Sequence, residues 1–76
     1  MPTIARLANG TINMYAGDHL PPHFHVRMKV GREVLLSIES LEVLRGSISR
    51  RELAEALAWA TENGSALLAQ WKVQNP

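Results

Sequence analysis

The three histidines of the chain lie within seven residues, in the segment "DHLPPHFHV" that spans residues 18–26. If this segment is extended, His23 and His25 lie on one face of a strand, because successive side chains alternate between the two faces. Asp18 and His19 add a carboxylate oxygen and a third nitrogen if the chain bends back before His23. These donors suit one divalent transition metal ion, Zn²⁺, Fe²⁺, Ni²⁺ or Mn²⁺, with at least one coordination position left open.

Two prolines, Pro21 and Pro22, separate His19 from the His23–His25 pair. Each proline ring fixes φ and restricts the preceding residue to extended backbone. A loop with few accessible conformations loses less entropy when it closes around an ion. Because a metal binds the neutral imidazole, we expect the affinity for metal to fall as the pH drops below about 6.5.

The same histidines allow two interpretations without a metal. Histidine can act as a general acid or base near neutral pH, and Arg27 shares the predicted face of His23 and His25. If Tyr15 faces them from the neighbouring strand, the four side chains are catalytic candidates for a nuclease or phosphodiesterase. In the second interpretation the histidines are structural and bind backbone carbonyls of the loop.

Two predicted hairpins position this segment. Residues 3–8 and 11–16 flank Asn9-Gly10, a pair typical of the two-residue type I′ turn. Residues 23–39 form the second hairpin, which turns near residues 30–32. The hairpins predict a four-stranded antiparallel meander.

The pattern becomes helical after residue 48. Ser49 and Glu52 form a capping box, and an apolar stripe follows at helical spacing. Asn63-Gly64 predicts the end of this helix, and residues 65–73 predict a second, shorter helix. We therefore expect an α+β fold, a single domain of residues 1–76, in which the four-stranded meander is followed by two C-terminal helices packed on one face.

Trp59 lies outside the apolar stripe of the first predicted helix. Tryptophan is over-represented at binding hot spots, so Trp59 is a candidate contact for a protein partner. The alternative is that it packs against the last helix.

Composition limits how the chain can be stabilised and which partners it can have. A chain of 76 residues has a thin core, and the absence of cysteine excludes disulfides and thiolate metal sites. A histidine-bound metal, a homodimer or another partner chain could supply the missing stability. No apolar run is long enough to span a bilayer and no export signal begins the chain, so we expect a cytoplasmic protein without membrane contact. The net charge of +1 supports RNA or DNA binding only weakly, although Arg45, Arg50 and Arg51 cluster near the first predicted helix.

The segments "MPTI", "DHLPPHFHV", "SRRELAEALAWATEN" and "ALLAQW" resemble a family of small prokaryotic domains of unknown function, which have a PTI start and an H-x-PPHxHV core. The resemblance places six residues at the core motif positions: His19, Pro21, Pro22, His23, His25 and Val26. It also implies a gene pair, because family members are often encoded beside a second small protein and such pairs have been proposed as toxin–antitoxin modules. We therefore expect a small bacterial interaction or regulatory module, with a nuclease or phosphodiesterase as the alternative.

Overall fold

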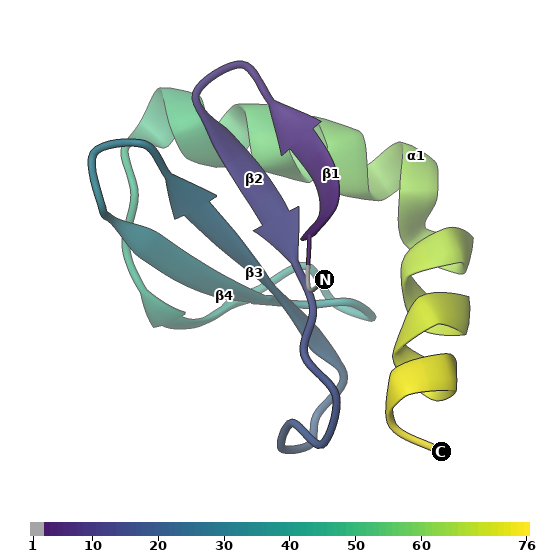
Figure 1. Cartoon of the computed structure of the whole chain (residues 1–76). Coiled ribbons are helices and arrows are strands. Elements are labelled where there is room, and N and C mark those ends of the chain that lie inside the picture. The colour runs from purple at the N-terminus through teal and green to yellow at the C-terminus, as the bar shows by residue number, and fades with distance from the viewer. Residues whose placement is uncertain (1–2) are drawn as a thin grey trace.

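A five-stranded antiparallel sheet and one long helix make up the protein in the computed structural model, which describes residues 3–76 (Figure 1). Met1 and Pro2, which belong to the "MPTI" segment, lie outside the described residues. The strands are β1 (Thr3–Leu7), β2 (Gly10–Asn13), β3 (His23–Met28), β4 (Glu33–Ser37) and β5 (Val43–Gly46), and the helix is α1 (Arg50–Gln74). The strands follow one another across the sheet in chain order, which leaves β1 and β5 as its edges.

Both predicted hairpins are present, with a small shift in the first. Its turn lies at residues 8–9, so that Gly10 already pairs with Leu7 in the ladder. A Cβ atom on Gly10 would lie 2.5 Å from the Arg27 carbonyl oxygen and 2.9 Å from the Met28 sulfur. Glycine is therefore needed at this position because β3 approaches β2 closely there.

The predicted alternation of β3 is confirmed by burial. Phe24, Val26 and Met28 are almost completely buried in the core, on the face covered by the first part of α1 (Figure 1). His25 and Arg27 alternate with them, so the opposite face carries the polar side chains.

The prediction of four strands and two helices is wrong. A fifth strand, β5, pairs with β4 through Val34↔Gly46 and Leu35↔Arg45. All four residues of β5 are exposed, so its sequence lacks the alternation that marks a half-buried strand. The turn before β5 contains Leu41, which has a positive φ of 61°. This conformation is usually adopted by glycine, so the sequence does not mark the turn.

The predicted break between two helices is a kink within α1. Asn63 has non-helical angles (φ −120°, ψ 17°), and its side-chain amide donates a 2.8 Å hydrogen bond to the Trp59 carbonyl. The chain then continues as helix through Gly64 instead of stopping. Beyond the kink, α1 changes direction and runs beside the end of the sheet where β3 begins (Figure 1). Among residues 3–76, no helix has the length and apolar character that crossing a membrane requires.

The predicted capping box is present at the start of α1. The Ser49 hydroxyl accepts the Glu52 N–H at 3.1 Å, and the Glu52 carboxylate accepts the Ser49 N–H at 2.9 Å. The hydrogen bond from the Ser49 backbone is the main reason why the pKa of Glu52 lies below its ordinary value.

We expect Ser49→Ala to lower the free energy of unfolding by about 1 kcal/mol, because the Glu52 N–H loses its partner. Ser49→Thr keeps the hydroxyl and is the matched control. Urea denaturation of the three proteins measures the effect, and an alanine variant as stable as the threonine variant would contradict it.

Candidate metal centre

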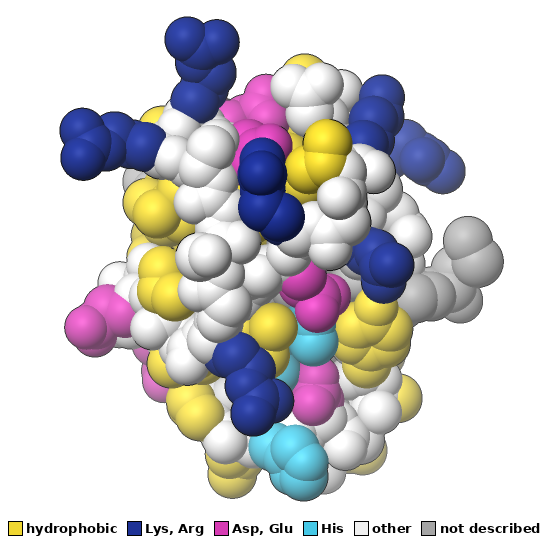
Figure 2. All heavy atoms as spheres, turned by 90° about the vertical axis from the view of Figure 1, so that its left-hand side faces the viewer, with side chains coloured by type: hydrophobic (Ala, Val, Ile, Leu, Met, Phe, Trp, Pro, Cys, Tyr) yellow, Lys and Arg dark blue, Asp and Glu magenta, His cyan; other side chains and the backbone are white. Residues whose placement is uncertain are grey.

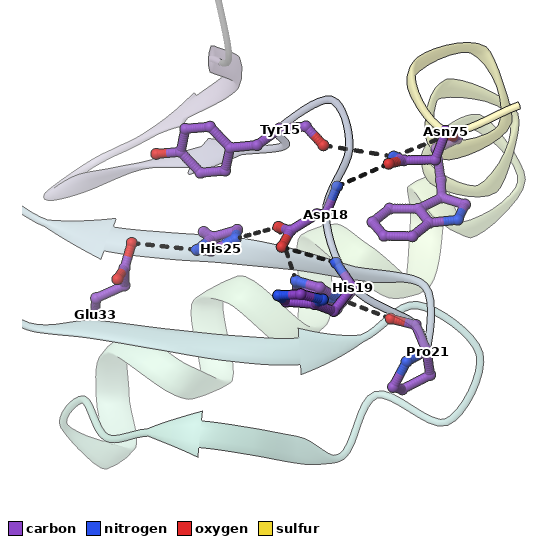
Figure 3. A network of polar contacts seen from close by, with 9 residues as sticks. Tyr15, Asp18, His19, Pro21, His25, Glu33 and Asn75 are labelled. Atoms are coloured by element: carbon purple, nitrogen blue, oxygen red, sulfur yellow. Dashed lines mark hydrogen bonds and ion pairs between the residues drawn. The ribbon is translucent and has the colours of Figure 1, made fainter.

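One carboxylate oxygen lies between two imidazole rings at the start of β3. Asp18, in the loop between β2 and β3, places its Oδ2 atom 3.0 Å from His23 Nε2 and 3.0 Å from His25 Nε2 (Figure 3). The three residues each offer one ligand atom, and these atoms lie within 4.8 Å of one another. The group could therefore hold a metal ion.

The contacts of His23 indicate that a proton or a cation lies between its Nε2 atom and Asp18. Its Nδ1 lies 2.8 Å from the Pro21 carbonyl oxygen, which can only accept, so Nδ1 carries the proton. In a neutral ring, Nε2 then has a lone pair directed at the Asp18 carboxylate, which also has only lone pairs. Such a contact at 3.0 Å is favourable when a proton lies between the two atoms or when both atoms bind a cation.

His25 also contacts Asp18 through Nε2, but its second nitrogen faces a carboxylate without a hydrogen bond. Its Nδ1 atom is buried without a hydrogen-bond partner, and Glu33 Oε2 lies 3.4 Å away (Figure 3). A small movement would complete a hydrogen bond from Nδ1–H to Glu33. Metal-binding histidines almost always donate their second N–H to a carboxylate or backbone carbonyl, which fixes the tautomer. Pro21 and Glu33 are placed to do this for the two rings.

Asn75, the C-cap residue of α1, holds the Asp18 loop. The Asn75 side chain accepts the Asp18 N–H at 2.9 Å and donates to the Tyr15 carbonyl at 3.4 Å. The Trp71 ring packs against the His23 ring, and the two ring centroids are 5.3 Å apart. Within the loop, the Leu20–Pro21 peptide bond is cis. The distal part of α1 therefore positions the group that β3 presents.

The group remains reachable from solvent. The side chains of Asp18 and His25 keep 21% and 14% of their surface exposed. Histidine side chains are visible between acidic side chains in the space-filling view, and Lys and Arg side chains project around them (Figure 2). An ion can therefore enter without unfolding the domain.

The other residues predicted for the site lie outside the group of Asp18, His23 and His25. His19 is exposed, and its backbone N–H donates to Asp18 Oδ1 at 3.0 Å, while its imidazole is not part of the three-residue group. Tyr15 lies edge-on to His25, with centroids 4.7 Å apart, and the exposed Arg27 follows His25 on β3. Trp59 is half-buried and packs against the hydrophobic core.

Sequence reasoning missed Glu33 and Asn75. Glu33 pairs with Arg27 across the β3–β4 hairpin, which puts it diagonally next to His25. Counting residues outward from a turn centred on Val30 could have found this neighbour. Asn75 lies 57 residues from Asp18, and no local pattern connects the two.

The surroundings of Asp18 change its acidity. Burial is the largest single influence and would raise the pKa of the Asp18 carboxyl, but the hydrogen bonds from the His25 side chain and the His19 N–H oppose it. Together with the charges of the two neighbouring histidines, they hold this pKa below its ordinary value.

A lowered pKa means that the folded protein binds this proton less readily than the unfolded chain. The contribution of Asp18 to stability is therefore present above its ordinary pKa of about 3.9 and is lost as the pH falls through the lower, folded-state value. In chelator-treated protein, we expect the difference in unfolding free energy between the unmodified chain and Asp18→Asn to shrink as the pH is lowered from about 5 to 3. Urea denaturation at each pH measures this difference, and a constant value would contradict the expectation.

The fold and the site together define a small α+β domain with a group of two histidines and one aspartate at the start of a central strand. The chain belongs to the family described as Domain of unknown function (DUF4160), whose model matches residues 11–72. This match confirms the predicted membership of an uncharacterised domain family. No curated protein and no solved structure shows a significant match to this chain.

Proposed function

We propose that this domain binds one divalent transition metal ion through Asp18, His23 and His25 and serves as a regulatory interaction module in a two-protein bacterial system. The observation that carries the metal is the pair of 3.0 Å contacts from two imidazole nitrogens to one carboxylate oxygen. Each ring also has an acceptor near its second nitrogen, at Pro21 and Glu33.

The donor set narrows the choice of ion. Two imidazole nitrogens favour Zn²⁺, Fe²⁺, Ni²⁺ or Mn²⁺ over Mg²⁺ and Ca²⁺, which prefer oxygen ligands. Three protein ligands leave further positions open for water or a ligand from a partner.

Elemental analysis of protein purified without a histidine tag tests the metal. We expect close to one equivalent of a single transition metal, or uptake of one equivalent of added Zn²⁺ after treatment with a chelator. Trp71 provides a second readout, because its ring lies against His23 and its fluorescence should change on binding. Protein that neither contains nor takes up metal would overturn the proposal.

An open sheet edge supports the interaction role. The edge strand β5 has one side without a strand partner within residues 3–76, and Val43 and Leu44 keep 48% and 45% of their surface exposed. Exposed edge strands present free N–H and C=O groups that can pair with a strand of another protein. We propose that this edge binds the small protein encoded nearby, as in toxin–antitoxin pairs.

Co-expression with the product of the neighbouring gene tests the partner. We expect a stable complex at micromolar concentration, weakened by Val43→Lys on β5 and unaffected by Val73→Lys on α1, which is also exposed. If the two proteins stay apart, or if β5 instead mediates a homodimer on size-exclusion chromatography, the partner assignment fails and the metal proposal is untouched.

A further inference from the structure

A second polar site lies on the same sheet, away from the three metal-ligand candidates. Arg6 on β1, Arg27 on β3 and Lys29 in the following turn line an open groove of about 390 Å³. The strand register places Arg6 opposite Thr11 and Thr11 opposite Arg27, so these residues form a row across three strands. All three basic side chains are exposed.

The positive charges of this groove have no carboxylate partner in the described part of the chain. Within residues 3–76, no carboxylate lies within ion-pair distance of Arg6, Arg27 or Lys29. Glu33 is the cross-strand partner of Arg27, yet its carboxylate lies beside His25 Nδ1. The interaction of Glu33 with the histidine therefore leaves Arg27 free for an external anion.

The groove also offers a hydroxyl donor. Thr11 Oγ1 accepts a 3.2 Å hydrogen bond from the Asn13 side chain, so its own proton can be donated to a ligand. Guanidinium groups match phosphate oxygens in a bidentate geometry, and a threonine hydroxyl is a common further contact to phosphate.

We propose that this groove binds the phosphate backbone of a single-stranded nucleic acid. Its open shape favours a polymer that runs along the sheet, because pockets for small molecules enclose most of their ligand. Tyr15, in the loop that follows β2, is 36% exposed beside His25 and offers a ring on which a base can stack. This assignment does not depend on the metal centre.

Fluorescence anisotropy with a labelled single-stranded RNA of about 12 nucleotides tests the proposal, with chelator present throughout. Binding should weaken linearly with the logarithm of salt concentration, and losing one phosphate contact should reduce that slope by about 0.7. We expect Arg27→Ala and Arg6→Ala each to show this change and the double variant to raise the Kd at least about tenfold. Arg51→Ala is the matched control, because this exposed arginine on α1 does not line the groove.

Three results would overturn the proposal, provided that circular dichroism shows the variants to be folded. The first is no binding at about 100 µM protein in low salt, where even non-specific complexes form. The second is binding that Arg6→Ala and Arg27→Ala leave unchanged. The third is equal affinity for a polyglutamate peptide with the same sensitivity to both variants, which would assign the groove to an acidic protein segment. Absence of metal uptake by the protein would not affect these outcomes.

Discussion

Replacing His25 with alanine should lower the affinity of the domain for Zn²⁺ by about 100-fold or more, since loss of a residue that only orients a ligand already costs about 10- to 100-fold. The variant removes one of the two nitrogens that contact Asp18 Oδ2. Isothermal titration calorimetry on chelator-treated protein measures the change. His25 lies on the face of β3 opposite the apolar core, so its removal leaves the core side chains in place.

Two further variants separate a metal ligand from its neighbours. His19→Ala is the matched control, because His19 is exposed and lies outside the three-residue group, and we expect its affinity to be unchanged. Glu33→Gln should weaken binding by about tenfold, because the amide orients His25 less strongly than a carboxylate. If His19→Ala weakens binding as strongly as His25→Ala, the loop rearranges around the ion and His19 belongs to the ligand set.

Gly46→Ala should destabilise the fold by about 2–4 kcal/mol, from backbone strain and steric overlap combined. Gly46 has a φ of +79°, which non-glycine residues rarely adopt, and an added Cβ would collide with the Glu33 carbonyl oxygen. Either β5 separates from β4 or the ladder shifts. Urea denaturation measures the loss, and hydrogen exchange of the β5 amides locates it.

The variant Gly31→Ala separates the free-energy cost of backbone strain from the cost of steric overlap. Gly31 also has a positive φ, of +92°, but an added Cβ would have no atom within 4 Å. We expect this variant to lose about 1 kcal/mol, the cost of the left-handed backbone alone. Equal losses at Gly31 and Gly46 would mean that β5 does not pack closely against β4 at Gly46.

Local sequence patterns predicted the elements that are stabilised locally. Alternation located β3, because Phe24 and Val26 are buried on one face and His25 lies on the other. The capping box of Ser49 and Glu52 is complete within four residues, and it located the start of α1. In both cases the feature that marks the element lies within a few consecutive residues.

Elements that depend on distant partners could not be predicted in the same way. β5 has four exposed residues and is held by its ladder to β4, so neither hydrophobicity nor period marks it. Asn63-Gly64 has the composition of a helix end, but packing of Leu67 and Trp71 in the core favours continuation of the helix after a kink. Propensity is a weak prior that tertiary contacts override.

The candidate site was predicted only in part, because some of its residues are brought together by contacts that are distant in sequence. The pairing of His23 with His25 follows from strand period alone, and Asp18 joins them across a short loop. Glu33 required the register of a neighbouring strand, and Asn75 required the path of the whole helix. Sequence reasoning therefore named Asp18, His23 and His25, but it also included His19, which lies outside the group, and it missed the residues that orient the rings.

The hydrogen bond between Asp18 and Asn75 has a consequence for synthesis of the protein. On the ribosome, the segment with the histidines emerges early, whereas the side chain that secures its loop follows 57 residues later. The nascent chain can build its first hairpins before then, but the loop stays unsecured until Asn75 has left the exit tunnel. The proposed ion can therefore bind in the finished geometry only after Asn75 has emerged and secured the loop.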